Sequence, residues 1–76
     1  MDEVAARMLI AQELAVAPAK VVDEADFRCL GADSLDLVSM TMLIEERFDI
    51  AISPDEAECC TTVGAAIRLL RAKLQH

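Results

Sequence analysis

The segment Leu30-Gly31-Ala32-Asp33-Ser34-Leu35-Asp36 predicts a turn followed at once by the start of a helix. Gly31 can adopt a backbone conformation that a side chain disfavours, so it marks the turn. Asp33 is a good N-cap because its carboxylate can accept from the first free backbone N–H groups, and Asp36 adds a second acid to the first turn. Ser34 is then the first helical residue, with its hydroxyl free to face water.

The Ser34 hydroxyl has two interpretations on this stretch alone. A serine in the first turn is an ordinary residue for a helix start. A phosphate ester on the same hydroxyl would lie beside the positive end of the helix dipole, and the neighbouring carboxylates would offset part of that benefit. The other residues of the chain are needed to distinguish an ordinary helix-start serine from one that carries a phosphate ester.

Four helical segments are predicted around this turn from hydrophobic residues at helical spacing. Their expected bounds are Asp2 or Glu3 to Leu14, Ser34 to Arg47, a short segment that begins at Pro54 and ends at Cys59-Cys60-Thr61, and a last helix capped by Thr61 or Thr62. Ser53-Pro54-Asp55-Glu56 is a capping box with proline at the first helical position. Pro18 is expected to stop any continuation of the first helix.

The segment from Val16 to Ala32 is expected to be a long ordered loop, pinned to the core by Val21, Phe27 and Leu30. On the helices, the residues expected to face the core are Ala6, Leu9, Ile10, Leu14, Leu37, Met40, Thr41, Ile44, Phe48, Val63, Ala66, Ile67, Leu70 and Leu74. The predicted fold class is all-α, an antiparallel four-helix bundle with a long first loop and a short third helix. Seventy-six residues make one domain, 1–76.

The other side of the second helix mixes apolar and acidic residues, namely Leu35, Asp36, Ser39, Met42 and Glu46. Such a surface suits a partner protein, and partial burial against a neighbouring segment explains it equally well. The net charge of −7 argues against nucleic acid and against an anionic membrane surface as partners. Residues 21–58 hold eleven acidic and two basic residues, which form either a solvated face or a landing surface for basic patches on partner enzymes.

No catalytic residue and no metal site is predicted. The single histidine, His76, is the last residue, and Ser34 has no base nearby in sequence to activate it. Asp23, Glu24 and Asp26 are not spaced like a calcium loop.

The chain has no membrane-spanning run and no signal-peptide pattern, so a cytoplasmic location is the default. The three cysteines fit no disulfide or zinc pattern and are expected to be small buried or half-buried thiols.

The order Gly31-Ala32-Asp33-Ser34-Leu35 resembles the modification motif of acyl carrier proteins. The resemblance runs from about Leu14 to about Leu70. It also includes Ala25-Asp26-Phe27, Glu45-Glu46-Arg47-Phe48-Asp49, Pro54-Asp55-Glu56-Ala57-Glu58 and Thr61-Thr62-Val63. It implies the same helical fold and a 4′-phosphopantetheine arm, derived from coenzyme A, attached to Ser34 between Asp33 and Leu35. The terminal thiol of that arm would carry acyl chains as thioesters for fatty-acid, lipid or polyketide biosynthesis.

The resemblance also implies partners: a phosphopantetheinyl transferase, and acyltransferases, ketosynthases and other acyl-handling enzymes with basic patches. It implies partner contacts at Leu35, Asp36, Met42, Glu45, Glu46 and Glu56. A monomer without stable membrane insertion is expected. The aliphatic interior could part to shelter an acyl chain, and Met40 and Met42 are close enough along the helix to line such a cavity.

Departures from the family pattern leave the pathway open. Carriers of primary fatty-acid synthesis tend to have acids at the positions of Ser39 and Arg47, and the loop before Leu30 is shorter here. Cys29, Cys59 and Cys60 are also unusual, which leaves room for a specialised pathway. Two alternatives remain: a peptidyl or aminoacyl carrier of a nonribosomal pathway, and a helical protein-interaction module in which Ser34 is unmodified.

Overall fold

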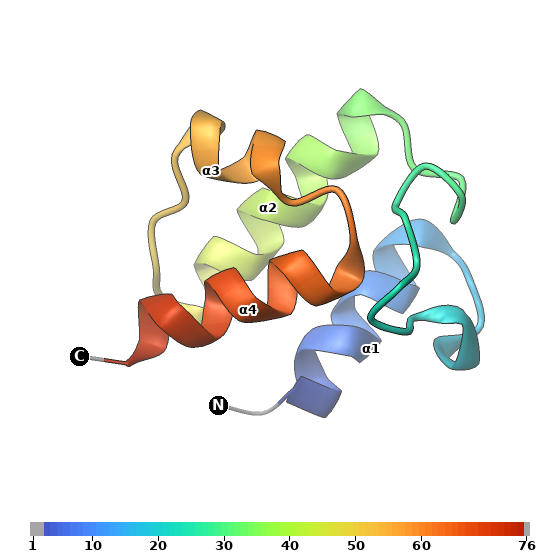
Figure 1. The fold of residues 1–76 in the computed structure, drawn as a ribbon, viewed down its shortest axis with the longest axis horizontal. Helices are drawn as coiled ribbons and strands as arrows, with labels where there is room; N and C mark the ends of the chain where they lie inside the picture. Colours follow the sequence, from blue (N-terminus) through green and yellow to red (C-terminus); the bar gives the residue numbers. More distant parts are fainter. Residues whose placement is uncertain (1–2, 76) are drawn as a thin grey trace.

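The computed structural model describes residues 3–75, and this range folds into α-helices joined by loops and one short 3-10 helix (Figure 1). The bounds are α1 Glu3–Leu14, η1 Pro18–Lys20, α2 Ser34–Phe48, α3 Pro54–Cys59 and α4 Val63–Leu74. The all-α prediction is confirmed, and the predicted helices are observed in this range. The second helix ends at Phe48 rather than Arg47, and the segment predicted as a long loop contains η1. Asp2 and His76 lie outside the described residues.

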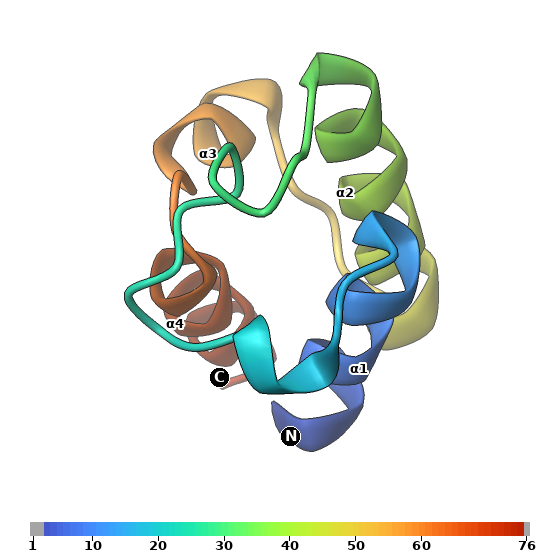
Figure 2. The ribbon, with the colours of Figure 1, turned by 90° about the vertical axis from the view of Figure 1, so that its right-hand side faces the viewer.

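The helices pack around a single core. Figure 1 shows α1 running in the opposite sense to both α2 and α4. The short α3 lies between α2 and α4 along the chain. Figure 2 shows α1 beside α2, with α4 across the core from α2. The described residues contain no helix long and apolar enough to cross a membrane.

The core is apolar throughout, and no polar or charged residue is buried in the described range. Its buried members are Ala6, Ile10, Ala11, Val21, Phe27, Ala32, Met40, Ile44, Val63, Ile67 and Leu70. Most of the predicted core positions are among them or pack partly buried against them. Ala11 and Ala32 are buried as well, although neither was predicted to face the core. Phe27, only 1% exposed, is the largest side chain at the centre of the core.

The first helix ends at Leu14 as predicted, but Pro18 does not end it. Ala15 takes the left-handed conformation, with φ of 55°, and the N–H of Val16 donates to the carbonyl of Ala11 at 3.0 Å. The chain has therefore left the helix before the proline arrives. Pro18 instead occupies the start of η1, where its fixed φ suits the first turn.

The long first loop is held against the junction of α3 and α4 by backbone hydrogen bonds. The N–H of Phe27 donates to the carbonyl of Thr61, and the N–H of Val63 donates to the carbonyl of Ala25, both at 3.0 Å. This pairing explains why Phe27 is buried although it lies in a loop. As predicted, Val21 is buried with it, and Leu30 packs partly buried against the core.

The three cysteines are free thiols, as predicted. Their burial is not as predicted: Cys29 and Cys59 are exposed, and only Cys60 is half-buried. Cys29 lies in the turn before α2, and Cys59 is the last residue of α3. Both segments are short and lie at the surface, which leaves these thiols in solvent.

Candidate functional site

The site begins at the turn and cap that open α2. Gly31 has φ of 89°, the left-handed region that glycine adopts without strain. Asp33 is extended and caps the helix: its Oδ1 accepts from the N–H of Asp36 at 2.9 Å. The Asp36 carboxylate in turn accepts from the N–H of Asp33 at 3.3 Å, which completes a capping box. The predicted cap is confirmed, and Asp36 does more than add charge.

Ser34 is the first residue of α2, and its side chain is exposed. In the described part of the chain, its hydroxyl has no hydrogen-bond partner. The capping carboxylates hold the backbone on either side, so the hydroxyl is presented from a fixed turn. An exposed, uncommitted hydroxyl on a rigid turn is a suitable point for attaching another group.

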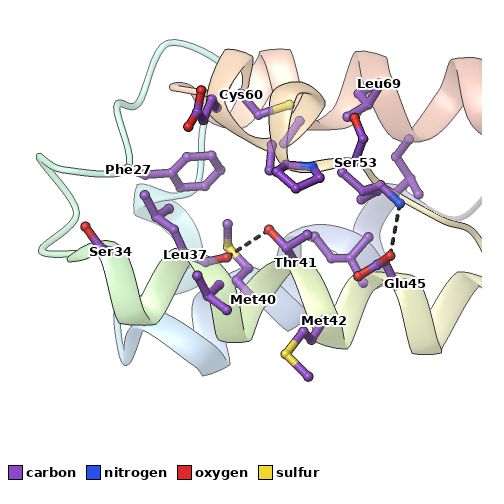
Figure 3. Close-up of a pocket in the computed structure, with 18 residues that line it drawn as sticks. Phe27, Ser34, Leu37, Met40, Thr41, Met42, Glu45, Ser53, Cys60 and Leu69 are labelled. Carbon is purple, nitrogen blue, oxygen red and sulfur yellow. Dashed lines mark hydrogen bonds between the residues drawn. The ribbon is translucent and has the colours of Figure 1, made fainter.

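A pocket of about 470 Å³ lies beside Ser34, between α2 and the segments that form α3 and α4 (Figure 3). Its lining is mostly aliphatic, contributed by Leu37 and Met40 from α2, Ile52 from the loop before α3, and Leu69 from α4. Such a lining favours an apolar guest over a charged one. Sequence periodicity could not reveal this pocket, because its walls come from segments far apart in the chain.

One end of the pocket lies near Ser34, and the other end lies near Glu45. Figure 3 shows Ser34, Phe27 and Cys60 towards one end and Glu45, Ser53 and Leu69 towards the other. Burial raises the pKa of the Cys60 thiol, which favours its neutral form. Between the ends, the Thr41 hydroxyl donates to the carbonyl of Leu37 at 2.8 Å.

The two methionines of α2 make unequal contributions to the pocket. Met40 is buried and reaches inward from α2. Met42 borders the pocket, but its side chain is 62% exposed and points outward in Figure 3. The expectation that both could line a cavity therefore holds mainly for Met40, because Met42 belongs largely to the outer face of the helix.

Three of the residues predicted to contact partners are exposed along the outer face of α2. Leu35 is 73% exposed, and Met42 and Glu46 follow it at helical spacing. Val38, which sequence reasoning did not single out, is 56% exposed on the same helix and extends the surface. The apolar residues Leu35, Val38 and Met42 recur at helical spacing along one stripe of α2. This spacing was the sequence signal that could have revealed Val38.

The other three predicted contact residues are engaged within the protein. Asp36 closes the capping box. Glu45 Oε2 accepts from the N–H of Ile52 at 3.0 Å. Glu56 Oε1 accepts from the N–H of Ser53 at 3.0 Å and from Lys73 Nζ at 2.7 Å. The hydrogen bond from Lys73, followed by that from Ser53, holds the pKa of Glu56 below its ordinary value.

Asp23, one of the acidic residues of the first loop, is part of an ion-pair network. Asp23 pairs with Arg7, which also donates to the carbonyl of Val21 at 3.2 Å. The hydrogen bond and the charge of Arg7 lower the pKa of Asp23. Across residues 3–75, no group of three histidine, cysteine, aspartate or glutamate side chains is arranged to hold a metal ion.

Comparisons with known proteins identify the family to which the chain belongs. The family model described as the phosphopantetheine attachment site matches residues 5–70, a range that includes Ser34 and the pocket. A protein of Sulfurovum sp. (strain NBC37-1) named acyl carrier protein is 44% identical over 63 residues, which cover 82% of this chain and 84% of the relative. The chain belongs to the acyl carrier protein family, whose members are carriers rather than enzymes and hold 4′-phosphopantetheine as a covalent cofactor.

Proposed function

We propose that Ser34 is the residue that carries the phosphopantetheine arm, with Asp33 and Leu35 flanking the attachment point. The supporting observation is an exposed hydroxyl, without a partner in the described residues, at the first position of α2. A phosphopantetheinyl transferase would supply the base. The Ser34 oxygen forms a P–O bond, the phosphoanhydride of coenzyme A breaks, and the adenosine bisphosphate leaves.

The arm supplies a terminal thiol that holds acyl groups as thioesters. We assign acyl chains as the cargo, for use in fatty-acid, lipid or polyketide biosynthesis. The aliphatic pocket supports this assignment, because it opens beside Ser34 and would remove an alkyl chain from water. An aminoacyl cargo has no comparable reason to enter it, since its charged amine would lose hydration.

The outer face of α2 is the surface that we assign to partner enzymes. Leu35 and Met42 offer apolar contacts, and Glu46 contributes to the negative charge around them. Partner enzymes with basic patches, such as the transferase, acyltransferases and ketosynthases, would be attracted to this surface. Asp36 in the first turn of α2, Glu45 beside the pocket and Glu56 on α3 would add negative charge near this surface while keeping their internal hydrogen bonds. High salt would weaken these encounters.

We also propose a monomer in a reducing, cytoplasmic setting. Three free thiols, two of them exposed, suit a reducing compartment. A net charge of −7 on a chain of 76 residues disfavours self-association.

The proposal is tested by incubation with coenzyme A and a phosphopantetheinyl transferase, followed by intact-mass measurement. The wild type and Ser39→Ala should gain one phosphopantetheine, whereas Ser34→Ala should gain none. Ser39 is a matched control because it is a half-buried serine on the same helix. No gain by the wild type with several transferases would refute the carrier role of Ser34. Loading with malonyl, long-chain acyl and aminoacyl donors then identifies the cargo class.

A further inference from the structure

Glu45 lies at the end of the pocket away from Ser34 (Figure 3). Both residues belong to α2, and the helical rise of about 1.5 Å per residue puts about 16 Å of helix between them. An acyl chain on the thiol of an arm folded back over the pocket, entering from the Ser34 end, therefore passes the aliphatic lining first. It meets the Glu45 carboxylate last.

The Glu45 side chain is fixed in place. Its Oε2 accepts from the N–H of Ile52 at 3.0 Å, in a bond that is partly buried. Its backbone carbonyl also accepts from the N–H of Asp49, which is left-handed at the end of α2, and from Ile50 at 3.1 Å. Residue 45 therefore joins the last turn of α2 to the loop before α3, across the end of the pocket.

An alkyl chain cannot advance past this carboxylate without a penalty. Contact would strip water from a carboxylate that, within residues 3–75, has the single hydrogen bond from Ile52 to compensate. Displacing the carboxylate would leave the partly buried N–H of Ile52 without its acceptor. Glu58 also borders the pocket, but it is exposed on α3 and can turn into solvent.

We infer that Glu45 sets the greatest length of acyl chain that the pocket can shelter. Acyl carbons that lie against the aliphatic lining short of Glu45 are buried and stabilise the fold. Carbons added beyond Glu45 stay in water and contribute nothing. This inference rests on the proposed attachment of the arm to Ser34.

The test uses a homologous series of saturated acyl chains, transferred with the arm from the corresponding acyl-coenzyme A. Mass spectrometry first verifies attachment at Ser34. The melting temperature of each acylated form is then compared with that of the same variant carrying the bare arm. In the wild type, the melting temperature should rise with chain length and then level off at a limiting length.

Two variants, Glu45→Ala and Glu45→Met, should move the limit to longer chains, and the second retains side-chain bulk in case the first folds poorly. Glu13→Ala is the matched control, because Glu13 is a half-buried glutamate, like Glu45, but lies on α1 and does not line the pocket. It should keep the wild-type limit. A limit unchanged in both Glu45 variants overturns the role of Glu45 alone, whereas failure of the arm to attach at Ser34 overturns the proposed function together with it.

Discussion

The N–H of Gly64 donates a hydrogen bond of 3.0 Å to the carbonyl oxygen of Asp23, and this contact ties the first loop to the start of α4. A Cβ on Gly64 would lie 3.0 Å from that same oxygen and 3.2 Å from the Cβ of Asp23. The loop continues from this contact through Phe27 to the start of α2. The close approach of residues 23 and 64 therefore helps to fix the position of Ser34.

Replacing Gly64 with alanine should destabilise the protein by about 1–3 kcal/mol, the usual range for overpacking a close contact. Helix propensity alone predicts the opposite, because alanine is the better helix former. Urea unfolding measures the difference. Ala72→Ser on the exposed side of the same helix should change stability far less. An unchanged or increased free energy of unfolding in Gly64→Ala would show that the first loop can shift to accommodate the added methyl group.

Asp33→Ala should cost about 1 kcal/mol of stability, because it removes the acceptor for the N–H of Asp36 and half of the capping box. The same urea titration measures it. Asp55→Ala is the control, since Asp55 is an exposed first-turn acid of α3 and not its N-cap. Equal losses in the two variants would contradict the capping role of Asp33.

Leu35→Ala should reduce kcat/KM of the transferase for this protein by roughly tenfold, as expected for an exposed apolar anchor in an interface. Its free energy of unfolding should stay within about 0.5 kcal/mol of the wild type, because the side chain packs little. Val4→Ala provides the comparison, since Val4 is equally apolar and exposed but lies on α1. If both variants were modified as fast as the wild type, the outer face of α2 would not be the transferase surface.

The pairing of Asp23 with Arg7 predicts a specific loss of stability in acid. The pKa of Asp23 in the folded protein is lowered from its ordinary value of 3.8. A lowered pKa stabilises the fold above the unfolded value, and this contribution disappears as the pH falls below 3.8 towards the folded value. Asp23→Asn should therefore lose less stability than the wild type between neutral and acidic pH.

Urea unfolding at a series of pH values compares Asp23→Asn with Glu24→Gln, a change at the neighbouring exposed carboxylate. Glu24→Gln should retain the wild-type dependence on pH. The same pH dependence in Asp23→Asn as in the wild type would mean that the ion pair with Arg7 contributes nothing to folding.

The parts of the fold that sequence predicted are those with local physical causes. Asp33, Ser53 and Thr62 cap the next helix by accepting from N–H groups three residues on, so each cap is visible in a short window of sequence. The inner faces of α2 and α4 follow from the period of 3.6 residues. The Ser34 turn and its exposure follow from the same local rules.

The parts that sequence did not predict depend on segments distant along the chain. The pairing of Phe27 with Thr61, and the pocket walled by α2, Ile52 and Leu69, appear only after the loop and α4 have packed. Glu45 illustrates the difficulty. The resemblance to acyl carrier proteins implied that Glu45 contacts partners. In the structure, the Glu45 carboxylate also accepts a hydrogen bond from the N–H of Ile52 across the end of the pocket.

The carrier role of Ser34 can be tested most directly from the chemical state of this residue in protein purified from cells that contain a phosphopantetheinyl transferase. Trypsin cleavage after Arg28 and Arg47 releases residues 29–47, a peptide that contains both Ser34 and Ser39. Fragmentation mass spectrometry should find one phosphopantetheine on that peptide and assign it to Ser34. A peptide that always lacks the group, or that carries it on Ser39, would contradict the account.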